Sequence, residues 1–93
     1  MVVGLRTWEL HLNGCASLKD KRRILKSLKD RLHQRFNVSV AETASHERWQ
    51  RAELSACVVA ADRIQAERVL ASADRLVEGH DLARIIDSVT SFL

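Results

Sequence analysis

Residues 17–36 form the segment that most restricts how this chain can fold. Apolar side chains recur along it at helical spacing, and most of the other positions are Lys or Arg. This pattern is typical of an amphipathic helix with one side buried against a core. Ser17 with Asp20 three residues later resembles a capping box at its start. The buried stripe is predicted to consist of Leu18, Ile24, Leu25, Leu28, Leu32 and Phe36.

The rest of the chain divides into segments with strand-like or helix-like patterns. Asn13-Gly14 and Asn37 interrupt these patterns, and Gly79 suits the residue after a helix. Asp62 with Gln65 is a second capping pattern. We therefore expect strands at 2–12, 38–44, 50–61 and 83–92, a second helix at 63–78, and a hairpin loop at 45–49.

The order βαββαβ predicts the fold class. Right-handed crossovers and one shared core favour an α+β, ferredoxin-like sandwich, in which both helices lie on one face of an antiparallel four-stranded sheet. The 93 residues are enough for one such core. We therefore expect a single domain over residues 1–93.

The third strand carries a further signal, because Ala56 to Ala61 is apolar or small on both faces. A strand with one face in water should alternate, whereas a strand buried on both faces need not. This pattern predicts that something covers the open face of the sheet. In a chain this short, we expect the cover to be a second copy, which makes a homodimer.

The charge of the chain is concentrated in the first helix. Residues 19–35 hold eight of the 15 Lys and Arg residues against two Asp, a net charge of +6, and the remainder has a net charge of −3. A localised basic face is an electrostatic footprint for RNA or another polyanion. It also fits two other interpretations, a solvated helix face or a docking site for an acidic protein. The residues on this side are Lys19, Arg22, Arg23, Lys26, Lys29 and His33.

The hairpin loop is a second candidate contact. Trp49 lies between Arg48 and Arg51, so the indole could stack on an unpaired base while the guanidiniums reach phosphates. The preferred alternative is that Trp49 folds back as a hydrophobic plug at the end of the sheet or at the edge of a dimer. A sheet-surface reader of the RNA-recognition-motif type is disfavoured, because the third strand has no aromatic side chain and Trp8 suits the core or a dimer contact.

Little in the sequence points to catalysis. The four His residues are scattered, none lies at metal-ligand spacing from Cys, Asp or Glu, and there is no glycine-rich phosphate loop. We expect no enzyme activity, no metal and no cofactor. Cys15 and Cys57 suggest reduced thiols, with Cys57 buried in a strand. Without a membrane-length apolar run or a leader pattern, we expect a cytoplasmic protein that does not bind membranes.

Two long strings of the sequence resemble one known family. Ser17-Leu18-Lys19-Asp20-Lys21-Arg22-Arg23 and Arg35-Phe36-Asn37-Val38-Ser39-Val40-Ala41-Glu42 are similar to the signature of the YlxP-like family, small bacterial domains of unknown function. The resemblance implies a ferredoxin-like fold. The family's genes often lie beside those of translation initiation and ribosome-binding factors, which implies a role near the ribosome or RNA. It supplies no catalytic residues.

Overall fold

The computed structural model describes residues 1–93 and contains every predicted helix and strand. The elements are β1 (Val2–Leu12), α1 (Leu18–Arg35), β2 (Ser39–Ala44), β3 (Arg51–Ala60), α2 (Arg63–Glu78) and β4 (Ala83–Phe92). Ser17 and Asp62 cap the two helices, and their side chains accept the backbone N–H groups of Asp20 and Gln65. The predicted boundaries are therefore correct to within one residue.

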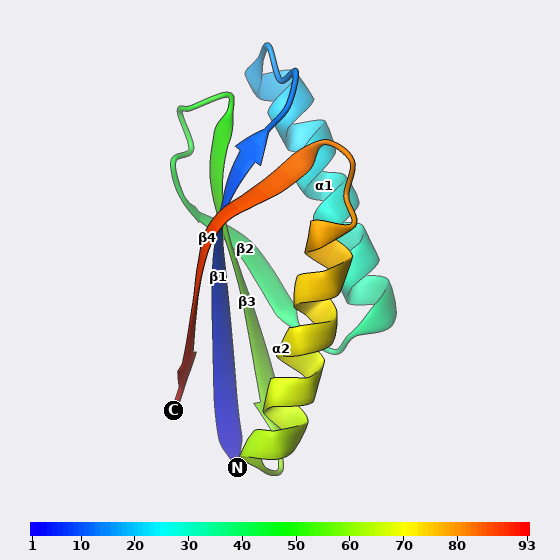
Figure 1. The fold of residues 1–93 in the computed structure, drawn as a ribbon, viewed down its shortest axis with the longest axis vertical. Helices are drawn as coiled ribbons and strands as arrows, with labels where there is room; N and C mark the ends of the chain where they lie inside the picture. The colour runs from blue at the N-terminus through cyan, green and yellow to red at the C-terminus, as the bar shows by residue number, and fades with distance from the viewer.

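The four strands form one antiparallel sheet in the order β2-β3-β1-β4. Both helices cover the same face of this sheet and run antiparallel to each other (Figure 1). This is the ferredoxin-like α+β fold that the element order predicted. Neither helix is long and apolar enough to cross a lipid bilayer.

The core lies between the sheet and the two helices. Trp8, Leu10 and Leu12 of β1 are fully buried there, with Leu28 and Leu32 of α1 above them. Burial of one such side chain contributes about 1.5–3 kcal/mol, so this layer accounts for much of the stability. Trp8 is thus a core residue.

Two glycines are needed where they stand. A Cβ at Gly4 would lie 3.0 Å from Cδ1 of Leu70, so the missing side chain lets α2 approach β1 closely. Gly14 has a φ of 69°, in the left-handed region that other residues adopt at a cost. It completes the turn between β1 and α1.

The buried side of α1 differs from the prediction at two positions. Leu18 is 39% exposed at the first turn, whereas Lys21 lies in the buried stripe with only 3% of its side chain exposed. Helical spacing places both on the inward half, but Leu18 is the first residue of the helix, where fewer neighbours cover it. Lys21 is tolerated because a carboxylate meets it inside.

The sheet face opposite the helices is open to solvent and apolar at one end. Val59 there is 65% exposed and lies opposite Val3, and Val89, opposite Thr7 farther along the same face, is also exposed. No part of the chain covers these side chains. Cys57 is half-buried on this face, which corrects the prediction that it is buried. The reason is that β3 buries the alternate residues Leu54, Ala56 and Val58 instead.

Candidate nucleic-acid interface

The outward side of α1 presents the predicted basic residues to solvent. Lys19, Arg22, Arg23, Lys26 and His33 are exposed, and Lys29 is half-buried. The 18 residues of α1 extend about 27 Å at about 1.5 Å per residue. The face is therefore a stripe along most of the helix layer, well separated from the sheet's open side.

The cations on this stripe are not equally free to bind a partner. Lys26 Nζ lies 2.7 Å from Oδ2 of Asp30 one helical turn later. Lys19, Arg22 and Arg23 form no ion pair or side-chain hydrogen bond within the chain. Their charge, like that of the half-buried Lys29, has no counter-ion in the protein, so these residues carry most of the attraction of the stripe for an anion.

Lys21 points the other way and joins α1 to the β2–β3 hairpin. Its Nζ lies 2.7 Å from Oε2 of Glu42 on β2 and donates a hydrogen bond of 2.6 Å to the carbonyl oxygen of Ser45. No other donor reaches that Glu42 oxygen. Ser45 has a φ of 64°, the only non-glycine residue with a positive φ, and begins the hairpin loop. The buried ammonium thus fixes the base of the loop against the helix.

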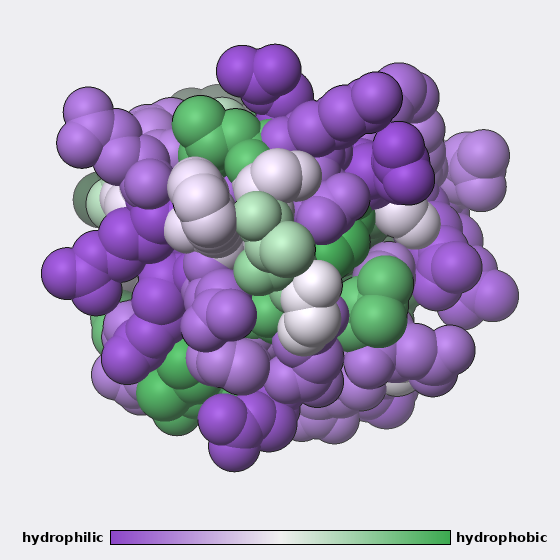
Figure 2. Space-filling model, turned by 90° about the horizontal axis from the view of Figure 1, so that it is seen from above, coloured by the Kyte–Doolittle hydropathy of each residue, from purple (hydrophilic) through white to green (hydrophobic).

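The hairpin loop lies at the same end of the molecule as the start of α1 (Figure 1). Arg48 is exposed and Trp49 is 52% exposed, so within one chain the indole does not form the predicted plug at the end of the sheet. A plug at the edge of a dimer stays a prediction. Viewed from this end, the surface is mostly hydrophilic, with small separate hydrophobic patches (Figure 2).

Arg51 is not part of this surface. Its guanidinium is paired with Glu9 of β1, and it lies opposite His11 in register, on the open face of the sheet. Strand alternation places Arg51 on the open face, because the next residue, Ala52, is buried in the core. The hairpin loop with Arg48 and Trp49 thus lies at the end where α1 begins (Figure 1), whereas Arg51 is paired with Glu9 on the open face of the sheet.

Sequence reasoning missed a second group of cations between the helices. Arg31 and Arg35 of α1 and Arg75 of α2 line a groove of about 460 Å³. Arg31 and Arg35 are one turn apart, a spacing that places them on one flank of α1. The sequence shows this spacing but not that α2 lies beside that flank.

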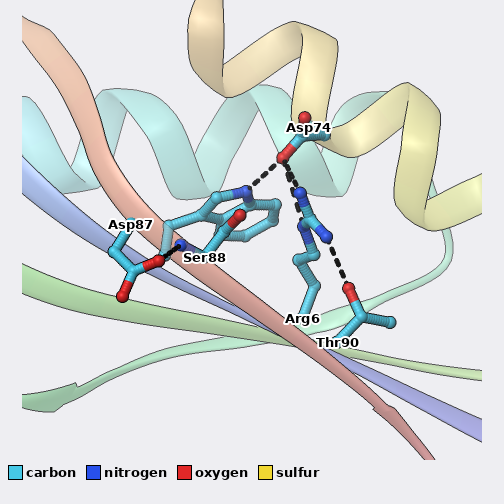
Figure 3. Close-up of polar contacts among 6 residues, drawn as sticks. Arg6, Asp74, Asp87, Ser88 and Thr90 are labelled. Carbon is cyan, nitrogen blue, oxygen red and sulfur yellow. Dashed lines mark hydrogen bonds and ion pairs between the residues drawn. The ribbon is translucent and has the colours of Figure 1, made fainter.

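A partly buried polar cluster ties α2 to the sheet. Oδ1 of Asp74 accepts hydrogen bonds from Arg6 Nε and Nη2 and from Nε1 of Trp8, at 3.1, 2.7 and 2.8 Å. These three bonds converge on one carboxylate oxygen, and Arg6 Nη1 donates separately to Oγ1 of Thr90 at 2.5 Å (Figure 3). Because the Trp8 N–H and the Arg6 guanidinium find their acceptors within the cluster, we interpret it as structural, although it borders a hollow of about 390 Å³.

The groups that could serve a metal or acid–base chemistry are dispersed. No group of three or more His, Cys, Asp or Glu side chains gathers in a metal-binding arrangement. Cys15 is buried, and its Sγ donates to the carbonyl oxygen of Ser17 at 3.4 Å. Burial, together with the nearby positive charge of Arg31, lowers the pKa of His80 below its ordinary value of 6.5, while Asp81 opposes the shift.

Comparison with known families assigns the chain to one of them. A family model described as "Protein of unknown function (DUF503)" matches residues 3–90. The chain belongs to this family. The "Uncharacterized protein YlxP" of Bacillus subtilis (strain 168) is 35% identical over 81 residues, which cover 83% of this chain and 88% of that protein. The resemblance to the YlxP-like family is therefore confirmed.

Solved structures with a similar fold are distant in sequence. The de novo designed protein Foldit4 has a TM-score of 0.58 and 16% identity, with 98% of this chain and 97% of that chain covered. SnoaB, a cofactor-independent oxygenase from Streptomyces nogalater, has a TM-score of 0.54 and 9% identity, with 99% and 90% covered. At such identities the likeness concerns the fold alone.

Proposed function

We propose that this DUF503 protein is a non-enzymatic RNA-binding protein that contacts RNA, on the ribosome or free, through the outward face of α1. The observation that carries the proposal is the set of exposed cations without counter-ions, Lys19, Arg22 and Arg23, on one helix face. Phosphates attract such a face regardless of base sequence. Arg48 and Trp49 extend the surface at the start of the helix.

The side chains of the sheet favour RNA binding by the helix face over RNA binding by the sheet face. An RNA-recognition-motif domain stacks bases on aromatic side chains of its central strands. Here Trp8, the aromatic residue of β1, is fully buried on the helix side, and β3 has none. The open face therefore lacks the stacking platform on which that mode of RNA binding depends.

Removing two arginines from the stripe tests the proposal. Arg22→Ala/Arg23→Ala is expected to weaken binding to ribosomal RNA about tenfold at low salt. For each phosphate that the variant no longer neutralises, the slope of log K against log salt concentration should become shallower by about 0.7 for single strands. Fluorescence anisotropy over a salt series measures both quantities. Arg84→Ala is the matched control, because Arg84 is exposed beside His11 on the opposite side of the sheet.

An unchanged affinity and salt slope in the folded Arg22→Ala/Arg23→Ala variant would contradict RNA binding by this face. The alternative function is a protein-interaction module whose basic helix docks an acidic partner. Pull-down from nuclease-treated lysate separates the two functions. A partner protein that is retained without ribosomal co-sedimentation, and that no longer binds when the same two arginines are removed, favours the alternative.

The open face of the sheet supports a second part of the proposal, a homodimer. The three long strands and the six-residue β2, at about 3.3 Å per residue and about 4.8 Å between strands, outline a sheet face of about 600 Å². Side-chain relief raises the accessible area toward the about 800 Å² per partner of a standard interface. In such a dimer, the apolar part of the open face of one copy covers the same part of the other copy. The exposed apolar residues of this face are Val59, Val89 and Leu93, and the half-buried ones beside them are Val3, Leu5 and Cys57.

A charge placed in this patch should abolish the dimer. The unaltered protein is expected to sediment as a dimer at micromolar concentration, and Val59→Glu as a folded monomer, because the carboxylate would be buried without a partner. Analytical ultracentrifugation measures the difference. Ile64→Glu is the control, since Ile64 is 63% exposed on α2, away from the sheet face. A monomeric unaltered protein would refute the dimer.

A further inference from the structure

We propose that the groove between α1 and α2 is a binding site for a phosphate group, held by Arg31, Arg35 and Arg75. The site is separate from the α1 stripe and stands whether or not that stripe binds RNA. Arg31 and Arg35 lie on the flank of α1 that meets α2, whereas Arg22 and Arg23 point outward. Nothing in the family's description assigns a ligand to this groove.

The groove is continuous and contains no acid. One hollow of about 460 Å³ is lined by the three arginines with Gln34, Leu76 and Gly79. An adjoining hollow of about 430 Å³ shares Arg35, Arg75 and Leu76 with it and adds Phe36 and Ser72. No carboxylate lines either hollow. The lining is therefore partly apolar, and every charged side chain in it is a cation.

The three guanidiniums have almost no partners inside the protein. None takes part in the five ion pairs of the chain. Arg75 Nη2 donates one hydrogen bond of 3.0 Å to Oγ of Ser72, and Arg31 and Arg35 donate none to a side chain. Three like charges gathered at one groove repel each other, and a bound anion would relieve this repulsion.

A simpler explanation accounts for only part of this arrangement. Arg35 and Arg75 lie in the last turns of their helices, where positive charge complements the helix dipole. The dipole does not explain why Arg31, one turn before the end of α1, is an arginine. It also does not explain why arginines from both helices line the same groove. The charge of Arg31 also affects a neighbouring group, because it adds to the effect of burial in lowering the pKa of His80.

The chemistry of the groove suits a phosphate group. Guanidinium is a planar fork that binds two phosphate oxygens at once, and three forks can surround a group with several charged oxygens. An open groove of this size accepts the phosphate of a small molecule, such as a nucleotide, or the terminal phosphate of an RNA strand. Both sources present the same phosphoryl oxygens.

Titration with inorganic pyrophosphate tests the site directly. Calorimetry at low salt is expected to show saturable binding at about one equivalent per chain. Arg35→Ala/Arg75→Ala should weaken it by about tenfold for each guanidinium removed. Arg35→Lys/Arg75→Lys should recover only part of the affinity, because Lys keeps the charge but not the fork. Arg68→Ala is the matched control, an exposed arginine of α2 outside the groove.

A second titration identifies the source of the phosphate. A preference for 5′-phosphorylated over 5′-hydroxyl RNA that disappears in Arg35→Ala/Arg75→Ala assigns the site to an RNA terminus. Equal binding of the two RNAs, with pyrophosphate still bound, assigns it to a small molecule. Arg22→Ala/Arg23→Ala should retain pyrophosphate binding even if it loses RNA, which separates this site from the α1 stripe. Two outcomes would overturn the proposal. One is that pyrophosphate shows no saturable binding up to about 10 mM, and the other is that Arg68→Ala loses as much pyrophosphate affinity as Arg35→Ala/Arg75→Ala.

Discussion

Glu42→Ala is expected to lower the free energy of unfolding by about 3 kcal/mol or more, because it leaves the Lys21 ammonium buried without its counter-ion. Only 3% of the Lys21 side chain is exposed, and Glu42 provides its one anionic contact. The remaining hydrogen bond to the Ser45 carbonyl cannot neutralise the charge. Urea denaturation, with an unchanged m value as the sign of an intact native state, measures the loss.

Two further variants show whether the loss comes from the unpaired charge. Lys21→Met/Glu42→Leu removes both charges and keeps the volume, so its stability should lie much nearer to that of the original protein than Glu42→Ala does. Asp30→Ala breaks the exposed pair with Lys26 and should change the stability by about 0.5 kcal/mol or less. If Glu42→Ala lowered the free energy of unfolding no more than Asp30→Ala does, the buried pair would not be what holds the hairpin against α1.

Asp74→Ala should destabilise the protein by about 2–4 kcal/mol, because one oxygen of Asp74 accepts three hydrogen bonds. Without it, the fully buried Trp8 loses the only acceptor of its indole N–H. Arg6 would keep only Thr90 in a partly buried site. The same denaturation experiment measures the effect, and the Trp8 contribution to near-ultraviolet circular dichroism should change with it.

Comparison with Asp74→Asn separates the hydrogen bonds from the charge. The amide oxygen can still accept from Trp8 but no longer carries a charge for Arg6, so we expect a loss between those of the original and Asp74→Ala. Glu67→Ala removes a carboxylate of the same helix that forms an exposed pair with Arg63, and should cost about 0.5 kcal/mol or less. A loss in Asp74→Ala no larger than in Glu67→Ala would contradict the structural role.

The sequence predicted the fold well because each element has its own local pattern. Capping at Ser17 and Asp62, helical spacing in residues 63–78 and alternation in the strands all depend on neighbours close in sequence. Helical spacing places Lys21 on the inward half of α1, but it does not show whether a charged ammonium can stay buried there. Its position depends on Glu42 and Ser45, which reach it only after the hairpin packs on α1.

The candidate site was predictable in part for the same reason. Helical spacing alone places Lys19, Arg22 and Arg23 on one exposed face. The structure shows that Lys26 is paired with Asp30 and that Arg51 is paired with Glu9, which is distant from Arg51 in the chain. The groove of Arg31, Arg35 and Arg75 requires knowing which flank of α1 lies beside α2, and no pattern within either helix provides that information.

The pairing of β1 with β4 has a consequence for how the protein folds. Gly4 lies opposite Phe92, and the backbones of Val3 and Leu93 exchange hydrogen bonds of 3.1 and 2.8 Å. β1 therefore has both of its edges paired only after β4, far along the chain, has joined the sheet. Loop closure over such a separation slows folding, and until β4 joins, one edge of β1 stays unpaired and open to pairing with another chain.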